Sequence, residues 1–244
     1  MRAIPASAEP PIHLSPAAEL AERVLLPGDP QRALAIAQAH LVEPRMFNTR
    51  RGLWGYTGRT GGGTAVTVQA TGMGGPSAAI VAEELIDLGA RTLVRTGTCG
   101  AIDPELALGE LVVVEAALAA DGTSRALGVD GRVGADRGLT AALAAAAGRS
   151  PAVVASTDLF YDHRGGLEEE WRAAGAVAVE MEAAAVLAVA ARRGVRAGCL
   201  LLVSDQVAGG DRTRLAQEEL EQGGVRLGEV ALRALADDDD STAR

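Results

Sequence analysis

Short strand-like runs alternate with longer Ala- and Leu-rich stretches along residues 18–236, and this alternation restricts the chain to few folds. The strand-like runs are Arg23–Leu26, Thr64–Ala70, Thr92–Arg95, Glu110–Ala116, Ala152–Ser156, Ala176–Val179 and Gly198–Val203. The helical patterns cover Gln31–His40, Ser77–Leu88, Thr140–Ala147, Leu167–Ala173, Met181–Arg193 and Arg214–Leu235. Strands alternating with helices of this length predict an α/β protein, with a three-layer α/β/α fold around a mixed, largely parallel sheet. Ligands bind such sheets outside the carboxyl ends of the strands, so functional residues are expected there.

Composition favours one domain with two appendages. The 244 residues, of which 48% are hydrophobic, can bury a large core. Because residues 1–12 are rich in proline and residues 237–244 contain four consecutive aspartates, we expect a flexible N-terminal arm (1–12), a single domain (13–236) and a disordered acidic tail (237–244). No apolar run reaches the ~20 residues of a membrane helix, and the N-terminus lacks a signal-peptide pattern, so we expect a cytoplasmic protein with no membrane partner.

The charge balance argues against nucleic acid as a partner. The chain has 23 arginines and no lysine against 32 acidic residues, a net charge of −9, whereas proteins that bind nucleic acids present basic surfaces. Any anion site must therefore use guanidinium groups or backbone amides. The two cysteines, Cys99 and Cys199, are far apart in the sequence and only three histidines accompany them, so we expect reduced thiols and no structural zinc.

The first polar strand end is the segment Pro-Gly-Asp-Pro-Gln-Arg at residues 27–32. Gly28 exposes backbone N–H groups, Pro30 suits the first position of a helix, and Arg32 lies one helical turn in. This arrangement is typical of an anion-binding cradle at a helix N-terminus. A tight strand-to-helix turn with a surface arginine explains the segment equally well.

A second loop, residues 71–77, matches the start of a dinucleotide-binding fingerprint. The match is partial, because Ser77 stands where the third glycine or alanine belongs and Pro76 stiffens the loop. The next strand-like run ends in Arg95 rather than in an acidic residue that would bind a ribose 2′-hydroxyl, although an arginine suits a 2′-phosphate. A nicotinamide-dependent oxidoreductase is therefore a disfavoured alternative.

The third strand end is Arg-Thr-Gly-Thr-Cys-Gly at residues 95–100. A guanidinium desolvated at the end of a core strand costs free energy unless it meets an anion. Thr98 and the glycine amides add hydrogen-bond donors, which favours an anionic ligand. An internal carboxylate is the alternative partner of Arg95, and the residues alone leave both open.

Three carboxylates follow two further apolar runs. Glu180 and Glu182 are two positions apart at a strand end, so they point to the same side, and Asp205 follows the run that ends at Val203. Because unpaired buried carboxylates are costly, three at one rim indicate hydrogen bonding to hydroxyls or proton transfer. Together with the arginines, they predict a small ligand with an anionic group, a polyhydroxyl portion and an atom that gains a proton.

In these motifs the chain resembles the nucleoside phosphorylases of the hexameric bacterial purine nucleoside phosphorylase and uridine phosphorylase type, from His13 to about residue 235. The motifs are Pro-Gly-Asp-Pro-x-Arg at 27–32, Arg51-Gly52 with Gly-Tyr-Thr-Gly at 55–58, Gly-Met-Gly at 72–74 with Pro76-Ser77, Arg-x-Gly-Thr-Cys-Gly at 95–100, Ser-Thr-Asp-Leu-Phe-Tyr at 156–161, Val-Glu-Met-Glu-Ala at 179–183 and Ser204-Asp205. The resemblance implies the nucleoside phosphorylase type I fold and a pentosyltransferase. Such an enzyme converts a purine (deoxy)ribonucleoside and phosphate reversibly into free base and (deoxy)ribose 1-phosphate.

The resemblance also implies roles for the matching residues. Phosphate is expected to contact the Gly28 amide, Arg32, Arg95 and Thr98, with Arg51 reaching in from a neighbouring subunit. The ribose is expected to contact Met181 and Glu182, with the neighbour's His13 at its 5′-hydroxyl. The base is expected beside Cys99, Gly100, Phe160, Val179, Glu180, Ser204 and Asp205. Asp205 and Arg95 are the expected catalytic residues, since Asp205 would protonate purine N7. Inorganic phosphate is then a co-substrate, and no cofactor or metal is expected.

Two implications concern assembly and specificity. Sharing of His13 and Arg51 requires at least a dimer, and the resemblance implies a homohexamer built as a trimer of dimers that serves nucleoside salvage or catabolism. Purine-specific relatives assist the acid with an arginine, but the corresponding position here is Glu218, which leaves Arg212 or Arg214 as candidates.

Three alternatives stay open beside a purine nucleoside phosphorylase. They are a uridine phosphorylase, a hydrolytic nucleosidase on the same fold, and a nucleoside-binding protein without activity. The first is disfavoured because the stretch after Tyr161 contains Arg164 but no glutamine to read a pyrimidine, and because Asp205 has a clear role only with a purine.

Overall fold

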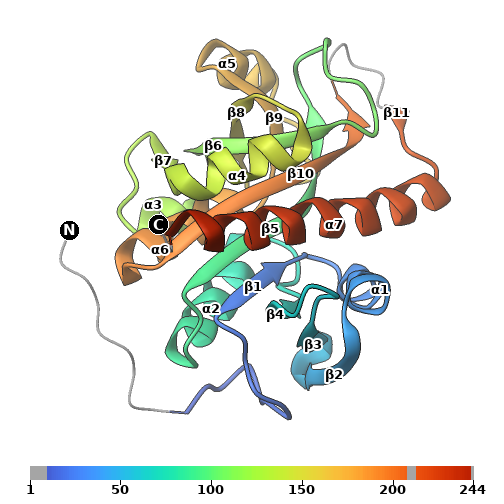
Figure 1. The fold of residues 1–244 in the computed structure, drawn as a ribbon. Helices are drawn as coiled ribbons and strands as arrows, with labels where there is room; N and C mark the ends of the chain where they lie inside the picture. The colour runs from blue at the N-terminus through green and yellow to red at the C-terminus, as the bar shows by residue number, and fades with distance from the viewer. Residues whose placement is uncertain (1–9, 208–212, 243–244) are drawn as a thin grey trace.

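The computed structural model describes residues 10–207 and 213–242. It confirms the predicted α/β fold class: in the described residues, eleven strands form one mixed sheet with helices on both faces (Figure 1). The strands are β1 (Arg23–Leu26), β2 (Val42–Asn48), β3 (Gly55–Arg59), β4 (Ala65–Gln69), β5 (Thr92–Ala101), β6 (Leu111–Ala119), β7 (Arg132–Gly134), β8 (Pro151–Ser156), β9 (Ala176–Glu180), β10 (Arg196–Gln206) and β11 (Thr213–Arg214). The helices are α1 (Pro30–His40), α2 (Gly75–Asp87), α3 (Gly122–Ala126), α4 (Arg137–Ala147), α5 (Leu167–Ala173), α6 (Ala183–Arg193) and α7 (Gln217–Thr242), and a 3-10 helix spans Arg50–Gly52.

One part of the sheet closes on itself. Strand β5 pairs with β10, and β6, β8 and β9 follow until β9 pairs with β5 again. On its other edge β5 continues into β1, β4, β3 and β2. Strands β1, β5 and β10 run parallel, with Leu26 opposite Arg95 and Arg95 opposite Cys199. Their carboxyl ends therefore meet at one edge of the sheet.

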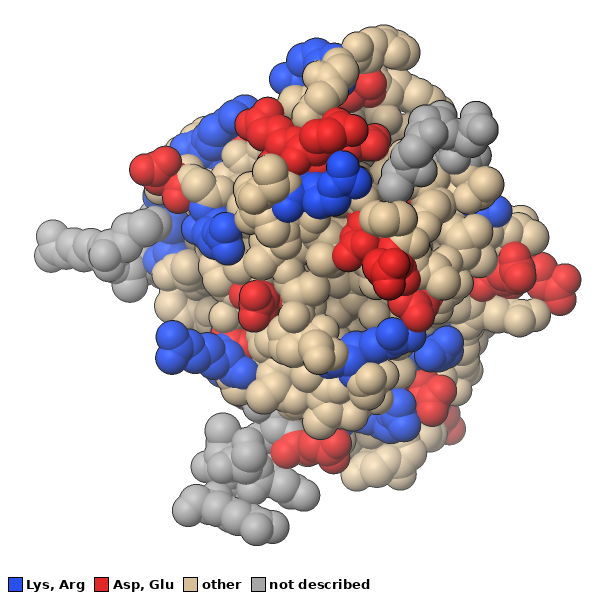
Figure 2. Space-filling view, turned by 90° about the horizontal axis from the view of Figure 1, so that it is seen from above, with Lys and Arg blue, Asp and Glu red and all other residues tan. Residues whose placement is uncertain are grey.

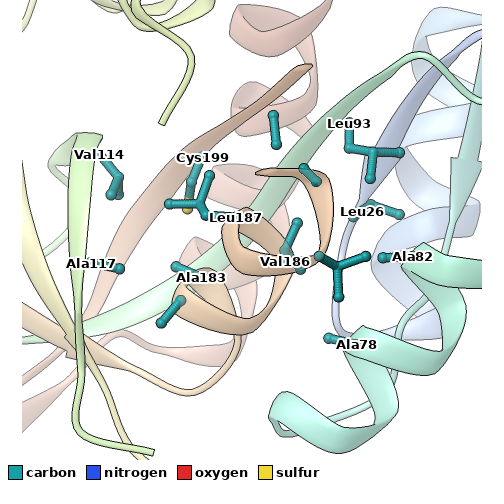
Figure 3. Close-up of a cluster of buried hydrophobic side chains, with 14 of the residues drawn as sticks. Leu26, Ala78, Ala82, Leu93, Val114, Ala117, Ala183, Val186, Leu187 and Cys199 are labelled. Atoms are coloured by element: carbon teal, nitrogen blue, oxygen red, sulfur yellow. The ribbon is translucent and has the colours of Figure 1, made fainter. Parts of the chain in front are cut away.

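Two hydrophobic clusters fill the spaces between the sheet and its helices. Ala78, Ala82 and Val186 from α2 and α6 pack on one face with Leu93 of β5 (Figure 3). Helices α1, α4 and α7 pack on the other face with Val94. Because successive side chains of a strand point to opposite faces, Arg95 continues the α2–α6 side of β5. Each fully buried aliphatic side chain contributes about 1.5–3 kcal/mol, so these clusters hold β5 firmly between the layers.

Strand β5 is longer than the sequence predicted. We expected a strand that ends at Arg95, but β5 runs to Ala101, because residues 96–101 pair with β10 and the last two also pair with β9. A Thr- and Gly-rich stretch has weak strand propensity, so this half of the strand depends on its neighbours. Arg95 therefore lies inside a central strand rather than at its end.

Strands β2, β3, β7 and β11 and helix α3 have no counterpart among the predicted elements. Pro44 interrupts the strand pattern of β2, and Gly55 and Gly58 weaken that of β3. The other three elements have five residues or fewer. Helix α6 begins at Ala183, two residues later than predicted.

The C-terminal helix is also longer than predicted. The sequence predicted it over Arg214–Leu235, whereas α7 runs from Gln217 to Thr242. It begins later because Thr213 and Arg214 pair with β10, and it ends later because extending an existing helix adds one hydrogen bond per residue. Within the described ranges, none of the helices combines the length and apolarity of a membrane span.

One carboxylate fastens residues 12–14 to helix α2. Glu84 accepts hydrogen bonds from the backbone N–H groups of Ile12, His13 and Leu14, and its Oε1 lies 2.7 Å from His13 Nδ1. Burial alone would raise the pKa of Glu84, but these hydrogen bonds hold it below its ordinary value. The orientation of His13 is therefore set by a charged partner on α2.

Replacing Glu84 with alanine is expected to release this segment. Because the folded pKa of Glu84 is depressed, its stabilisation is present above the unfolded pKa and is lost as the pH falls through the folded value. The amides of Ile12, His13 and Leu14 should exchange at least about tenfold faster in Glu84→Ala at pH 7, since hydrogen bonds to a charged group contribute roughly 1.5–3 kcal/mol. Hydrogen exchange measures this, and Glu19→Ala at an exposed position is the control. Unchanged protection in Glu84→Ala would contradict this role.

Candidate active site

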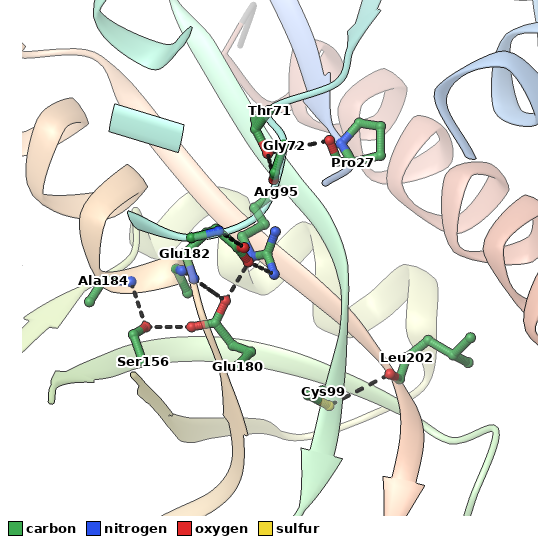
Figure 4. A network of polar contacts seen from close by, with 12 residues as sticks. Pro27, Thr71, Gly72, Arg95, Cys99, Ser156, Glu180, Glu182, Ala184 and Leu202 are labelled. Carbon is green, nitrogen blue, oxygen red and sulfur yellow. Dashed lines mark hydrogen bonds and ion pairs between the residues drawn. The ribbon is translucent and has the colours of Figure 1, made fainter. Parts of the chain in front are cut away.

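The centre of the site is Arg95, a buried guanidinium held between two carboxylates (Figure 4). Its Nε donates to Glu180 Oε2 at 2.8 Å, and its Nη2 lies 2.5 Å from Glu182 Oε2. Gly97 makes this conformation possible, because a Cβ at that position would stand 2.5 Å from Arg95 Nη2. Of the two partners that the sequence left open for Arg95, internal carboxylates are present in the structure.

Each of the two carboxylates is held by further donors. Glu180, the last residue of β9, accepts hydrogen bonds from the Ser156 hydroxyl and from the backbone N–H groups of Glu182 and Ala183. Glu182, the N-cap residue of α6, accepts from the backbone N–H of Gly74 at 2.5 Å. Gly74 has a φ of +91°, which favours glycine and turns its N–H toward Glu182. The loop 71–77 therefore helps to position Glu182.

Burial and the charges of neighbouring groups both shift the pKa values of Arg95 and Glu182. Burial alone would lower the pKa of Arg95, but Glu182 and Glu180 raise it above its ordinary value. Burial raises the pKa of Glu182, and the nearby charge of Glu180 adds to this effect against the attraction of Arg95. Arg95 keeps donor capacity, since its Nη1 makes no hydrogen bond to a described residue. A ligand anion can therefore contact Arg95 without first breaking its ion pairs.

Arg32, from helix α1, extends toward this cluster. Asp29 caps α1 by accepting from the Gln31 N–H. Within the described residues, the Arg32 guanidinium has neither a hydrogen-bond nor an ion-pair partner, although it interacts electrostatically with Asp29, Arg95 and Glu182. Burial, and after it the like charge of Arg95, lowers the pKa of Arg32. A half-buried and a buried cation close to each other favour the binding of an anion between them.

Asp205 lies near the carboxyl end of strand β10, the strand that pairs with β5. Its carboxylate is buried, and its Oδ2 accepts from the Ser204 hydroxyl at 2.7 Å. The register of β10 against β5 shifts between Val203 and Asp205, a bulge of the kind that often redirects side chains next to active sites. Strand β11 places Arg214 opposite Asp205, with Arg214 Nε 3.8 Å from Asp205 Oδ1. Arg212, the other candidate for this role, lies outside the described residues.

The ends of three strands bring further predicted residues together. Gly100 is paired with Val179 on one side and with Asp205 on the other. Cys99 is buried, its Sγ donates to the Leu202 carbonyl, and it lies within electrostatic range of Glu180, Arg95 and Asp205. Burial raises the pKa of Cys99, so this thiol stays protonated and packs as a core residue.

An open cavity of about 710 Å³ adjoins the cluster. Met181 and Gly74 line it next to Glu182, with Met73 and Asp158 further out. Phe160, on the loop after β8, is exposed and packs edge-on against Tyr161. Gly28 and Thr98 are half-buried, and a Cβ on Gly28 would lie 3.2 Å from the Gly72 carbonyl, so the loop at 27–32 touches the loop at 71–77.

Two predicted residues are not joined to this cluster. His13 is bound to Glu84, and Arg51 is exposed in the 3-10 helix with a φ of +59°. No contact among the described residues links either one to Arg32, Arg95 or Glu182. A left-handed backbone at a residue other than glycine carries strain, which tends to occur at functional sites.

Three residues that shape the site were not predicted from the sequence: Ser156, Gly97 and Gly74. All three lie within motifs that were noticed, but their roles depend on side-chain directions and pairings that only the fold provides.

In the part of the chain that the structure describes, no group of three or more His, Cys, Asp or Glu residues is arranged to hold a metal, and both cysteines are free and buried. On the face shown in Figure 2, acidic and basic side chains are interspersed without a broad basic field.

Comparison with known proteins finds one family and several similar proteins. Residues 22–236 match the family model described as the phosphorylase superfamily. The chain is 39% identical over 228 residues to the purine nucleoside phosphorylase DeoD-type of Geobacillus kaustophilus strain HTA426, covering 88% of this chain and 93% of that protein. It is 38% identical over 232 residues to the protein of the same description from Jannaschia sp. strain CCS1, covering 91% and 98%. A third such protein, from Clostridium beijerinckii, is 37% identical over 235 residues, covering 92% and 98%.

The family match covers most of the chain, and the motifs that the structure gathers around Arg95 all lie within it. The chain belongs to the phosphorylase superfamily.

Proposed function

We propose that the protein is a purine nucleoside phosphorylase, which converts a purine (deoxy)ribonucleoside and phosphate into free base and (deoxy)ribose 1-phosphate. The observation that carries this proposal is the convergence of Arg32 and Arg95 beside Glu182, because it combines an anion site with an acceptor for sugar hydroxyls. The relatives named as purine nucleoside phosphorylases favour purines over uridine. Salvage or catabolism of nucleosides in the cytoplasm is the corresponding physiological role.

The phosphate is proposed to bind between Arg32 and the free edge of Arg95, with the Gly28 amide and Thr98 as further donors. A phosphate oxygen attacks C1′ as the C1′–N9 bond breaks, and positive charge develops on the ribose. A dianion below C1′ stabilises this charge more in the transition state than in the ground state. The cluster of Arg95, Glu180 and Glu182 preorients the arginine, so little rearrangement is needed.

The ribose is proposed to lie over Met181, with its 2′- and 3′-hydroxyls donating to Glu182. Glu182 is well suited to this, because its carboxylate is buried and already fixed by Gly74 and Arg95. The open cavity beside Met181 provides space next to this contact. No group other than phosphate is required for the chemistry, so we propose that the enzyme uses no metal or organic cofactor.

The base is proposed to lie beside Gly100, Val179 and Phe160, with Asp205 donating a proton to purine N7. The proton neutralises the negative charge that develops on the leaving base. Arg214, 3.8 Å from Asp205, would stabilise the carboxylate that remains after the transfer. In this chain the assisting arginine then comes from strand β11 rather than from the following helix.

A complete site is proposed to need a neighbouring subunit. Arg32 and Arg95 are balanced by Glu180 and Glu182, so a phosphate dianion would leave the pocket with an excess of negative charge. Arg51 of a partner would supply a third cation, and the partner's His13, oriented by Glu84, would contact the 5′-hydroxyl. A homohexamer built as a trimer of dimers satisfies this requirement.

A nucleoside panel with and without phosphate tests the proposed function. Inosine and adenosine should be cleaved only when phosphate is present, with ribose 1-phosphate as product and uridine a much poorer substrate. Release of base without phosphate would identify a hydrolytic nucleosidase instead. Binding of nucleoside without any cleavage would identify a binding protein.

Asp205→Asn is expected to lower kcat for inosine by about 10²–10⁴-fold, the usual contribution of a general acid, with a smaller change in KM. Steady-state kinetics at saturating phosphate measure both constants. A raised KM with an unchanged kcat would restrict Asp205 to substrate binding.

Arg214→Gln is expected to lower kcat about twofold to fivefold, because a partly exposed ion pair contributes up to about 1 kcal/mol. The KM for inosine should change less than kcat in the same variant, because Arg214 contacts the proton donor rather than the nucleoside. Arg226→Gln removes the same charge from an exposed position of α7 and should leave both unchanged. Equal effects of the two substitutions would exclude a specific role for Arg214.

Mixing two inactive variants tests the sharing of Arg51. In a mixed dimer of Arg51→Ala and Asp205→Asn subunits, one site has both its own Asp205 and the partner's Arg51. Random pairing in an equal mixture makes about half of the dimers mixed, and each mixed dimer has one intact site of two, so co-refolded mixtures should recover roughly a quarter of the wild-type activity. No recovery in mixtures shown to contain mixed dimers would place Arg51 in its own subunit's site or outside it.

A further inference from the structure

Helix α7 contains three glycines near its middle, Gly223, Gly224 and Gly228, although glycine destabilises a helix interior relative to alanine. Each one permits a close approach. A Cβ on Gly223 would lie 2.6 Å from Leu202, and one on Gly228 would lie 2.7 Å from Ile36. A Cβ on Gly224 would lie 3.2 Å from Arg32 Nε and 3.3 Å from its Cγ and Cδ. The side chain of Arg32 therefore rests on the backbone of α7.

Arg32 belongs to one face of α1 that packs against α7. Arg32, Ile36 and His40 are spaced four residues apart, so they lie on the same side of the helix. Ile36 meets α7 at Gly228, and His40 Nε2 lies 3.0 Å from the Val225 carbonyl. Arg32 is the last member of this row on the side of the active site.

Packing must fix Arg32, since no polar partner does. Within the described residues its guanidinium has no hydrogen bond or ion pair, and the charges of Asp29 and Glu182, which attract it, act against that of Arg95, which repels it. A flexible side chain without a hydrogen-bond partner can adopt several rotamers unless its stem is confined. The backbone of α7 at Gly224 provides that confinement.

We infer that Gly224 is a positioning residue for phosphate binding, because the absence of a side chain there lets Arg32 lie across α7 with its guanidinium beside Arg95. The inference rests on the proposed role of Arg32 as a phosphate ligand. If it holds, helix α7, which lies outside the catalytic motifs, directly influences the affinity for phosphate.

Gly224→Ala tests this inference. The added methyl displaces Arg32 by a few tenths of an ångström, and we expect the KM for phosphate to rise about threefold to tenfold. This rise is smaller than the ~100-fold loss of rate that a misplacement of 1 Å can cause. The KM for nucleoside should stay unchanged. The melting temperature should not fall, since alanine favours the helix. Calorimetric titration with phosphate gives an independent measure of binding.

Two further variants make the result decisive. In an Arg32→Ala background, Gly224→Ala should have no additional effect on the KM for phosphate, because its target is gone. Glu229→Ala, at an exposed position of the same helix, is the control and should leave the KM for phosphate unchanged.

The outcomes separate the inference from the proposed function. If Arg32→Ala alone does not alter the KM for phosphate, the proposed role of Arg32 fails. If Arg32→Ala does alter the KM for phosphate, three results would overturn the role of Gly224 while the proposed function stands. These are no effect of Gly224→Ala alone, the same effect of Gly224→Ala in the Arg32→Ala background, and an equal effect of Glu229→Ala.

Discussion

The ion-pair cluster of Arg95 with Glu180 and Glu182 is the interaction on which the rest of the site depends. Removing three charges from water costs several kcal/mol per ion, and such a cluster persists only if hydrogen bonds satisfy its remaining atoms. Here Ser156, the N–H groups at the start of α6 and the N–H of Gly74 supply those bonds. The cluster thus joins β5, β9, α6 and the loop before α2 at one point.

In the proposed function one buried group would serve two subsites. The carboxylates hold the Arg95 guanidinium from one side, which fixes its direction and leaves Nη1 without a partner among the described residues. Glu182 is hydrogen-bonded to Gly74, which lines the open cavity, so the proposed sugar and anion contacts would lie on neighbouring groups of one rigid unit. Arg32 differs, since it has no such polar support and depends on contact with α7.

Motifs in the sequence predicted the fold class and most of the residues that meet at the sheet edge. A short apolar run followed by Gly, Arg or Glu indicates a buried strand with polar or glycine residues at its carboxyl end, where ligands bind in such folds. The partner of Arg95 could not be chosen this way, since it depends on the antiparallel pairing of β5 with β9, which brings together residues 85 positions apart. Likewise, counting along the chain from Asp205 led to Glu218, whereas a short strand that the sequence pattern does not reveal places Arg214 opposite Asp205. Gly224 was invisible to sequence reasoning because its role is a close approach between distant helices.

The central claim is that one phosphate binds between Arg32 and Arg95 beneath the sugar site. A crystal structure of the protein with phosphate tests it most directly. The account predicts phosphate oxygens at about 2.7–3.2 Å from both guanidinium groups, while Glu180 and Glu182 keep their contacts with Arg95. Phosphate bound elsewhere, or Arg95 in contact with its two carboxylates alone at saturating phosphate, would contradict it.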